Sequence, residues 1–338
     1  MATSPLWPLA AALLAAAVVS AALIAVLKPL LVRYALARPN ARSSHAVPTP
    51  QGGGIAVIAA TFIAASPVLV LLTPADQQLQ IWILFAATAF LAIVGAVDDI
   101  RTIEATPRLV MQFIAVGVVG GLLSSDIHIV PMLPPAIERI LLVVAGVWLV
   151  NLTNFMDGID WMTVTEVVSI TLGLFLLALL GALPLAAAIV ALALHGAILG
   201  FAPFNRPVAR LFLGDVGSLP IGLLLFWLLL QLAGRGHLAA ALLLPLYYLA
   251  DATLTLVLRM ARGESILQAH RTHFYQRATN VGWTVPAIIT RVACTNALLV
   301  ALAVASVWAP SAGVQVATFI AGLAAVALLL RHLTRGTS

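Results

Sequence analysis

The chain contains one long apolar run after another, and this feature restricts its fold more than any other. A bilayer's hydrocarbon core is about 30 Å thick, so each helical crossing needs roughly 20 apolar residues. Only 9% of the 338 residues are charged, whereas a typical globular protein has about 25%. We therefore predict an all-α, polytopic integral membrane protein that forms a single transmembrane domain over residues 1–338. The sequence contains about eleven such runs, at 6–32, 53–73, 79–97, 107–123, 137–152, 163–181, 183–202, 217–233, 238–259, 284–306 and 311–331.

The first run is expected to remain as a helix and not to be removed as a signal peptide. No Lys or Arg precedes it, and it is longer than the apolar region of a signal sequence. The single cysteine, Cys294, lies inside an apolar run, so no disulfide framework is expected.

Arginine is distributed very unevenly between the two sets of loops that alternate crossings would create. One set has only Arg139 and Arg235, and the other has 13 arginines. These 13 are Arg33, Arg38, Arg42, Arg101, Arg108, Arg206, Arg210, Arg259, Arg262, Arg271, Arg277, Arg331 and Arg335. The positive-inside rule then places the N-terminus in the periplasm and the C-terminus in the cytoplasm. The basic loops suit anionic lipid headgroups and anionic substrates.

The acidic residues gather on the same predicted side as the arginines. Eight of the 12 acids lie in or beside the arginine-rich loops. They are Asp98, Asp99, Glu104, Asp157, Asp160, Glu166, Asp215 and Glu264. Carboxylates clustered among apolar helices usually hold a metal or relay protons. The plainer alternative for any one of them is a solvated loop charge.

Asp98 and Asp99 end the third run. Two adjacent acids are unfavourable at a helix C-terminus, because the helix dipole is already negative there. The pair therefore predicts a compensating cation or a nearby arginine.

Polar groups recur at every third position after the fifth run, at Asn151, Asn154, Asp157 and Asp160. Side chains three apart meet on a helix surface. An ideal helix drifts over four such steps, so we predict an unwound segment at Gly158. Amides and carboxylates in this arrangement suit Mg²⁺, which prefers oxygen ligands and keeps waters for phosphates to share. The alternative, a polar helix cap, explains only one of the four.

Asp215 stands between Gly214 and Gly217 at the beginning of the eighth run. Glycine permits a ligand to approach the backbone closely, and a helix N-terminus favours phosphate oxygens. The alternative is a helix N-cap formed by Asp215 or Ser218.

Two further loops are rich in polar side chains, at Arg42–Gly54 and Ala269–Arg277. Their histidine, arginine and tyrosine side chains suit diphosphates and sugar hydroxyls. His270 and His273 could instead form a zinc pair, although the surrounding arginines would repel a cation.

Taken in order, these stretches resemble the polyprenyl-phosphate N-acetylhexosamine-1-phosphate transferases of the glycosyltransferase 4 group. Five motif regions occur in the expected order, and the resemblance covers nearly the whole chain. The first loop, Arg42 to Pro50, and the last, Gln268 to Arg277, are most similar to the O-antigen-initiating branch.

The resemblance implies that a UDP-N-acetylhexosamine gives its sugar-1-phosphate to undecaprenyl phosphate and that UMP leaves. It implies Mg²⁺, with Mn²⁺ as a substitute, bound by Asn154 and Asp215. It implies catalytic roles for Asp98, Asp99, Asp157 and Asp215. It implies substrate binding by Arg42, His45, Asn151, Asn154, Asp160, His270, Arg271, His273 and Arg277. The active site would lie on the cytoplasmic face of the bacterial inner membrane.

The chain departs from the family pattern in three places. Trp161 stands where the family usually has glycine, and Gln51 stands where a basic residue is common. The acidic pair is followed by Ile100-Arg101-Thr102, without a third acid.

Two other functional classes compete with this reading. A transporter or flippase would place ionisable groups near the middle of the membrane, and only His195, Asp251 and Arg291 lie within runs. A phosphatidyl-alcohol transferase would need Ala-Arg after Asp157-Gly158, and the chain has Ile159-Asp160. Nothing in the sequence names the sugar or the oligomeric state.

Overall fold

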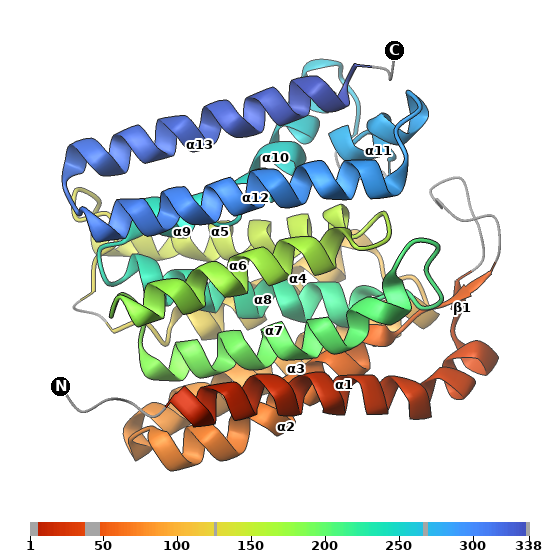
Figure 1. Cartoon of the computed structure of the whole chain (residues 1–338), viewed down its shortest axis with the longest axis horizontal. Helices are drawn as coiled ribbons and strands as arrows, with labels where there is room; N and C mark the ends of the chain where they lie inside the picture. Colours follow the sequence, from red (N-terminus) through yellow and green to blue (C-terminus); the bar gives the residue numbers. More distant parts are fainter. Residues whose placement is uncertain (1–5, 38–47, 125–126, 266–269, 336–338) are drawn as a thin grey trace.

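A computed structural model describes residues 6–37, 48–124, 127–265 and 270–335. Within these ranges the chain is almost entirely helical, as predicted, and its long helices run side by side (Figure 1). The helices are α1 (Leu6–Tyr34), α2 (Gly53–Leu72), α3 (Ala75–Ile100), α4 (Ala105–Gly120), α5 (Pro135–Met156), α6 (Met162–Leu179), α7 (Leu185–Asn205), α8 (Asp215–Ala233), α9 (Leu238–Leu243), α10 (Leu246–Ala261), α11 (Phe274–Asn280), α12 (Val285–Trp308) and α13 (Ala312–Leu333).

Nine helices in the described part of the chain are long and apolar enough to cross a membrane. They are α1, α2, α3, α5, α6, α7, α8, α12 and α13. The chain is thus a multi-pass membrane protein. The fifth run, which is short in the sequence, folds as a helix of 22 residues, whereas α4 has only 16.

The predicted run at 238–259 is not one continuous helix. It is divided into α9 and α10 at Leu244 and Pro245. Proline has no backbone N–H, and its ring clashes with the preceding turn, so a helix is interrupted there. Apolar composition alone does not reveal this break.

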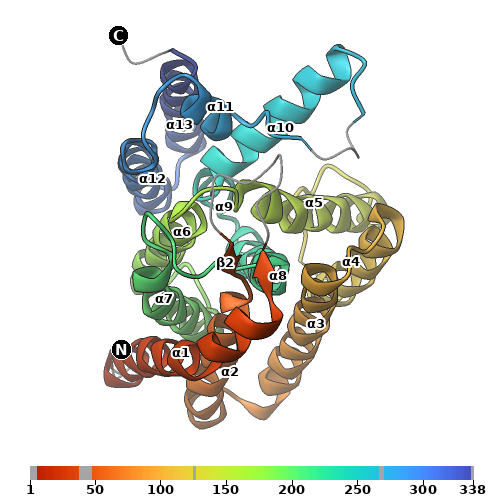
Figure 2. The same cartoon turned by 90° about the vertical axis from the view of Figure 1, so that its right-hand side faces the viewer.

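Helix α8 is the most enclosed span of the bundle. Of its most apolar 18-residue window, 94% is buried, compared with 28% for α13. Its apolar residues lie on all sides of the helix, which is typical of a helix surrounded by others, and Figure 2 shows it in this position.

Glycines on α2 and α3 allow these helices to pack closely against the beginning of α8. A Cβ on Gly95 of α3 would collide with the backbone of Asp215, and one on Gly54 of α2 would collide with Gly217.

A small hairpin lies over the beginning of α8 (Figure 2). Strands β1 (Leu36–Ala37) and β2 (Thr49–Pro50) pair antiparallel. The next residues bond the loop before α8, since the Phe212 N–H donates to the Pro50 carbonyl and the Gly53 N–H donates to the Phe212 carbonyl, each at 2.9 Å. The connection from α1 to α2 is therefore attached to the connection from α7 to α8.

The two ends of the helix bundle carry different segments of the chain. Helix α1 begins at one end and α13 finishes at the other (Figure 1). The hairpin and α11 lie at the end where α13 finishes, together with the last residues of α3 and α5 and the first residues of α8. The polar motifs of the sequence therefore meet at one end.

Candidate active site

Asp99 connects the end of α3 to the beginning of α8. Its Oδ1 accepts the N–H of Asp215 at 2.9 Å, and its Oδ2 accepts the N–H of Val216 at 3.1 Å. The first N–H groups of a helix have no partner within it and carry a partial positive charge. This contact explains how a carboxylate is tolerated at the negative end of α3. The Gln51 amide also donates to the Asp99 backbone carbonyl at 2.9 Å, a contact that needs no positive charge.

Asp98 is paired with an arginine, as the sequence requires. Arg108 Nη1 lies 2.8 Å from Asp98 Oδ2 and 3.8 Å from Asp215 Oδ2. The Ile103 N–H donates to Asp98 Oδ1 at 2.6 Å. Arg108, in the first turn of α4, was absent from the predicted site residues. Only the unbalanced charge of the acidic pair indicated that such a cation was needed.

The last turn of α5 faces the first turn of α8. Asn154 Nδ2 donates to Asp215 Oδ1 at 2.7 Å and to Ser218 Oγ at 2.9 Å. Asp215 begins α8, as predicted, and its side chain is 29% exposed, against 5% for Asp98. Asp215 is therefore more accessible to a ligand than Asp98 is.

The donor set fits a hard cation such as Mg²⁺ in chemical type. Mg²⁺ takes oxygen ligands and is usually held by one or two carboxylates together with substrate phosphates. Asn154 turns its amide nitrogen toward Asp215, and a half-turn of the amide would present its oxygen instead. In the described ranges, no three His, Cys, Asp or Glu side chains are grouped to hold a metal. A cation between Asn154 and Asp215 would therefore need phosphate and water oxygens to complete its shell.

Asp157 follows the last residue of α5, so the helix unwinds just before Gly158, close to the predicted position. Thr163 Oγ1 donates to Asp157 Oδ1 at 2.6 Å. The pKa of the Asp157 carboxyl is raised to about 7, chiefly by burial and also by the charges of Asp99 and Asp160, although the hydrogen bond from Thr163 lowers it. The carboxyl thus lies within the electrostatic reach of Asp99.

Helix α11 is attached to this unwound segment. Tyr275 Oη donates to the Phe155 carbonyl at 2.9 Å. A Cβ on Gly158 would collide with the Tyr275 hydroxyl, so glycine permits the contact. The loop that begins at His270 is therefore held beside the end of α5.

Asp251 of α10 fixes the beginning of α11. It is fully buried, and its carboxylate accepts the N–H of Phe274 at 3.0 Å and of Tyr275 at 3.2 Å. His273 Nδ1 lies 3.3 Å from Asp251 Oδ1. Asp251 was not among the predicted site residues, since an acid within an apolar run gives no sign of its partner.

The remaining predicted residues occupy three kinds of position. His270 lies 5.0 Å from His273 between ring centroids, and its Nδ1 is 3.0 Å from Thr272 Oγ1. Arg271 donates to Thr279 at 3.4 Å, and Arg277 is exposed over the Phe274 ring. His270, Arg271 and His273 lie in the loop before α11, and Arg277 lies on α11 itself. Arg42 and His45 lie outside the described residues.

Asn151 and Asp160 are buried in contacts within the protein. Asn151 Nδ2 donates to the side chain of Gln112 on α4 and to the Val147 carbonyl. Asp160 Oδ2 accepts the N–H of Ala209 at 3.0 Å. The structure therefore does not group these two with Asn154 and Asp215.

Trp161 adopts a backbone conformation that favours glycine. Its φ is 63°, in the left-handed region. Its backbone N–H donates to Asn205 Oδ1 at 2.9 Å, and its indole N–H donates to the Ala202 carbonyl at 2.8 Å. These bonds hold the tryptophan in a turn where the resembled family usually has glycine.

The fold and the site define a multi-pass membrane protein with carboxylates, an amide and an arginine gathered at one end of its helix bundle. The model of glycosyl transferase family 4 matches residues 81–233, a segment that includes Asp98, Asp99, Asn154, Asp157 and Asp215. Over this segment the chain is similar to glycosyl transferase family 4, the group that its sequence motifs also resemble.

Relatives of known function are similar over much of the chain. A decaprenyl-phosphate N-acetylglucosaminephosphotransferase of Mycolicibacterium smegmatis is 28% identical over 312 residues, covering 82% of this chain and 77% of the relative. The protein of the same name from Mycobacterium tuberculosis is 28% identical over 282 residues, 73% of this chain and 70% of the relative. A phospho-N-acetylmuramoyl-pentapeptide-transferase of Caldanaerobacter subterraneus is 27% identical over 193 residues, 52% of this chain and 58% of the relative.

Proposed function

We propose that the protein transfers an N-acetylhexosamine-1-phosphate from a UDP-sugar to undecaprenyl phosphate and releases UMP. The lipid-diphosphate-linked sugar would begin the synthesis of a cell-surface polysaccharide such as O-antigen. The names of the relatives support the kind of reaction, because each transfers a phosphosugar and two of them act with decaprenyl phosphate. The two polar loops that resemble the O-antigen-initiating branch support the downstream use.

The observation that carries the proposal is the cluster of Asp98, Arg108, Asn154 and Asp215. It joins α3, α4, α5 and α8 at one end of the bundle. Two phosphorylated anions must meet in this reaction, so the site needs both cations and precisely placed acceptors. Arg108 supplies a fixed positive charge, and the exposed part of Asp215 supplies an open carboxylate.

In the proposed reaction, an oxygen of the lipid phosphate attacks the phosphorus that carries the sugar. The bond from that phosphorus to the oxygen bridging it to UMP breaks, and UMP leaves with the electron pair. A phosphate monoester has a second pKa of about 6 and is largely ionised at pH 7, so no strong base is required. We assign Asp98 an orienting role through Arg108, and proton removal by Asp98 is the alternative.

The residues that would hold Mg²⁺ are Asn154 and Asp215. When bound, the cation would neutralise the diphosphate oxygens and the charge on the departing UMP. Arg108 would approach the same phosphates from α4. The diphosphate and the sugar would be contacted by His270, Arg271 and His273 from the loop before α11, and by Arg277 from α11 itself.

We further propose eleven crossings of the bacterial inner membrane, with the N-terminus outside and the site in the cytoplasm. Eleven helical regions are available if α4 and the broken α9–α10 segment each cross once. An odd number of crossings agrees with the beginning of α1 and the end of α13 lying at opposite ends of the bundle.

The test is UMP release by the purified protein in vesicles that contain undecaprenyl phosphate. A panel of UDP-GlcNAc, UDP-QuiNAc and UDP-FucNAc would be offered, each with and without the lipid. We expect one donor to give UMP only when the lipid is present. Absence of lipid-dependent UMP release with any UDP-N-acetylhexosamine would contradict the proposed function.

A further inference from the structure

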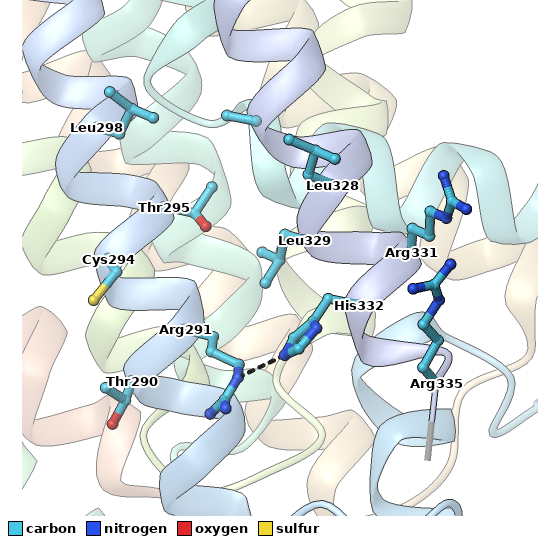
Figure 3. A pocket seen from close by; sticks show the side chains of 11 residues that line it. Thr290, Arg291, Cys294, Thr295, Leu298, Leu328, Leu329, Arg331, His332 and Arg335 are labelled. Atoms are coloured by element: carbon cyan, nitrogen blue, oxygen red, sulfur yellow. Dashed lines mark hydrogen bonds between the residues drawn. The ribbon is translucent and has the colours of Figure 1, made fainter. Parts of the chain in front are cut away.

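An open groove of about 970 Å³ runs between α12 and α13. Figure 3 shows that its lining is divided along its length. Leu298 and Leu328 line one end, and Arg291, Arg331 and Arg335 line the other. The groove is therefore amphipathic, because leucines line one end and arginines from both helices line the other.

No carboxylate in the described part of the chain lies within ion-pair distance of these three arginines. Arg291 is six residues beyond Val285, or about 9 Å along α12 from its first residue. A cation at this depth is costly unless it has a partner. The contacts of Arg291 among the described residues are with neutral groups: its Nε donates to His332 Nε2 at 3.1 Å, its Nη1 donates to the Ala287 carbonyl at 3.0 Å, and its guanidinium lies 4.1 Å from the Trp283 ring centroid.

Helices α12 and α13 lie at the outside of the bundle. Only 39% and 28% of their most apolar windows are buried. In Figure 2 they lie on the opposite side from α3 and α4, which contribute Asp98, Asp99 and Arg108 to the candidate active site. The groove is therefore separate from the acidic cluster and is placed where membrane lipid would surround the protein.

We infer that this groove binds an anionic phospholipid. The phosphodiester would contact the guanidinium groups of Arg291 and of Arg331 or Arg335, because arginine matches phosphate oxygens in charge and geometry. An acyl chain would lie along Leu298 and Leu328. Basic pockets between transmembrane helices bind anionic headgroups in this way. The apolar half of the groove favours a lipid over free phosphate.

Bound lipid would join two helices that already meet at the same end. The Trp283 indole N–H, just before α12, donates to the Arg335 carbonyl after α13 at 2.9 Å. A ligand that binds only the folded state stabilises it by mass action. The protein should therefore be more resistant to heat in the presence of this lipid.

The first experiment is native mass spectrometry of the full chain, released from micelles with equal amounts of phosphatidylglycerol and phosphatidylcholine of the same acyl chains. We expect the wild type to retain one phosphatidylglycerol in preference to phosphatidylcholine. Arg291→Gln should weaken that retention about fivefold, the effect of removing one cation near a lipid headgroup. The triple change of Arg291, Arg331 and Arg335 to glutamine should abolish the preference. Arg262→Gln, which alters an exposed arginine after α10, is the matched control and should keep the preference for phosphatidylglycerol.

A second variant keeps the test valid if loss of charge disturbs insertion. Thr295→Trp fills the groove and leaves every arginine in place, so it should also lower phosphatidylglycerol retention. Phosphatidylglycerol should raise the unfolding temperature of the wild type, and inorganic phosphate at the same concentration should not.

The inference is overturned if the wild type retains both lipids equally or if Arg262→Gln loses as much as Arg291→Gln. It is also overturned if inorganic phosphate reproduces the thermal shift. A third contrary result is a dimer that the groove variants convert to monomer without a change in lipid retention, since a second copy of the chain would then cover the groove.

Discussion

Asp215 combines two structural roles with the exposure that a ligand requires. It begins α8, accepts the amide N–H of Asn154, and faces Arg108 with its other oxygen. A carboxylate that served only as a helix cap would not need the neighbouring arginine. The contacts therefore favour the hypothesis that it belongs to the reacting centre, and substitution tests this directly.

Asp215→Asn should leave the protein folded and inserted but nearly inactive. The amide keeps an oxygen that can accept the Asn154 N–H, so packing should survive, while one negative charge is removed from the proposed metal site. We expect UMP release to fall at least about 100-fold, roughly 3 kcal/mol in the barrier. Asp76→Asn, at the opposite end of α3, is the control. If Asp215→Asn keeps more than about a tenth of the activity at matched abundance and saturating Mg²⁺, Asp215 is a cap and not a metal ligand.

Metal dependence follows from the same residues. Asn154, Asp157 and Asp215 offer oxygen donors at the junction of α5 and α8, which suits Mg²⁺ or Mn²⁺. We expect an excess of EDTA to abolish UMP release and added Mg²⁺ or Mn²⁺ to restore it. Full turnover in excess EDTA would contradict the proposed role of the cation.

Trp161 allows backbone strain to be measured separately from side-chain contacts. Trp161→Gly and Trp161→Ala lose the same indole, but only glycine adopts the φ of 63° without steric cost. We expect the glycine variant to be more stable than the alanine variant by about 1 kcal/mol. At most positions the alanine variant is the more stable of the two. Thermal unfolding of both variants in one detergent measures the difference. An alanine variant equal to or more stable than the glycine variant would show that the turn is not strained.

At the scale of elements, short α11 depends on a carboxylate from its neighbour α10. Asp251 satisfies the N–H groups of Phe274 and Tyr275, and His273 bonds the same carboxylate. A seven-residue helix has too few internal hydrogen bonds to be stable alone. The position of α11 and of the loop before it, which begins at His270, thus depends on α10.

Asp251→Ala should loosen α11 while leaving α12 intact. Loss of hydrogen bonds to a buried carboxylate costs roughly 1.5–3 kcal/mol, so amide exchange at Phe274 and Tyr275 should accelerate about tenfold or more. Hydrogen exchange with mass spectrometry measures this. Thr284→Ala removes the cap of α12, where Thr284 Oγ1 accepts the Ala287 N–H, and should accelerate exchange only there. Unchanged exchange in α11 of Asp251→Ala would mean that Asp251 does not position the loop.

For the whole molecule, the arginine asymmetry and the positions of the helix ends predict one orientation. Reporter tags after Ser338 and in the 260–283 loop should report the cytoplasm, and a tag at Met1 should report the periplasm. The physical reason is that arginine-rich loops are retained on the cytoplasmic side. A periplasmic C-terminus would show that the number of crossings is wrong.

The sequence by itself determined the helical, multi-pass fold and most of the candidate site. Apolar runs and loop charges are local properties, because each crossing must bury its own backbone polar groups within the membrane. They identified the helical regions, the end that carries the polar motifs, the unwinding near Gly158, the beginning of α8 at Asp215 and the need for a cation beside Asp98.

Only the tertiary structure decided which groups meet. It identified Arg108 as the cation beside Asp98. It also showed that the Asp99 carboxylate accepts the first N–H groups of α8 and that the Asp251 carboxylate accepts the first N–H groups of α11. It also directed Asn151 toward Gln112 on α4 and not toward Asp215. Each of these pairs joins helices that are distant along the chain, and their contacts depend on how closely the backbones pack. No run length or residue spacing contains that information, so the site's geometry appears only when the bundle is assembled.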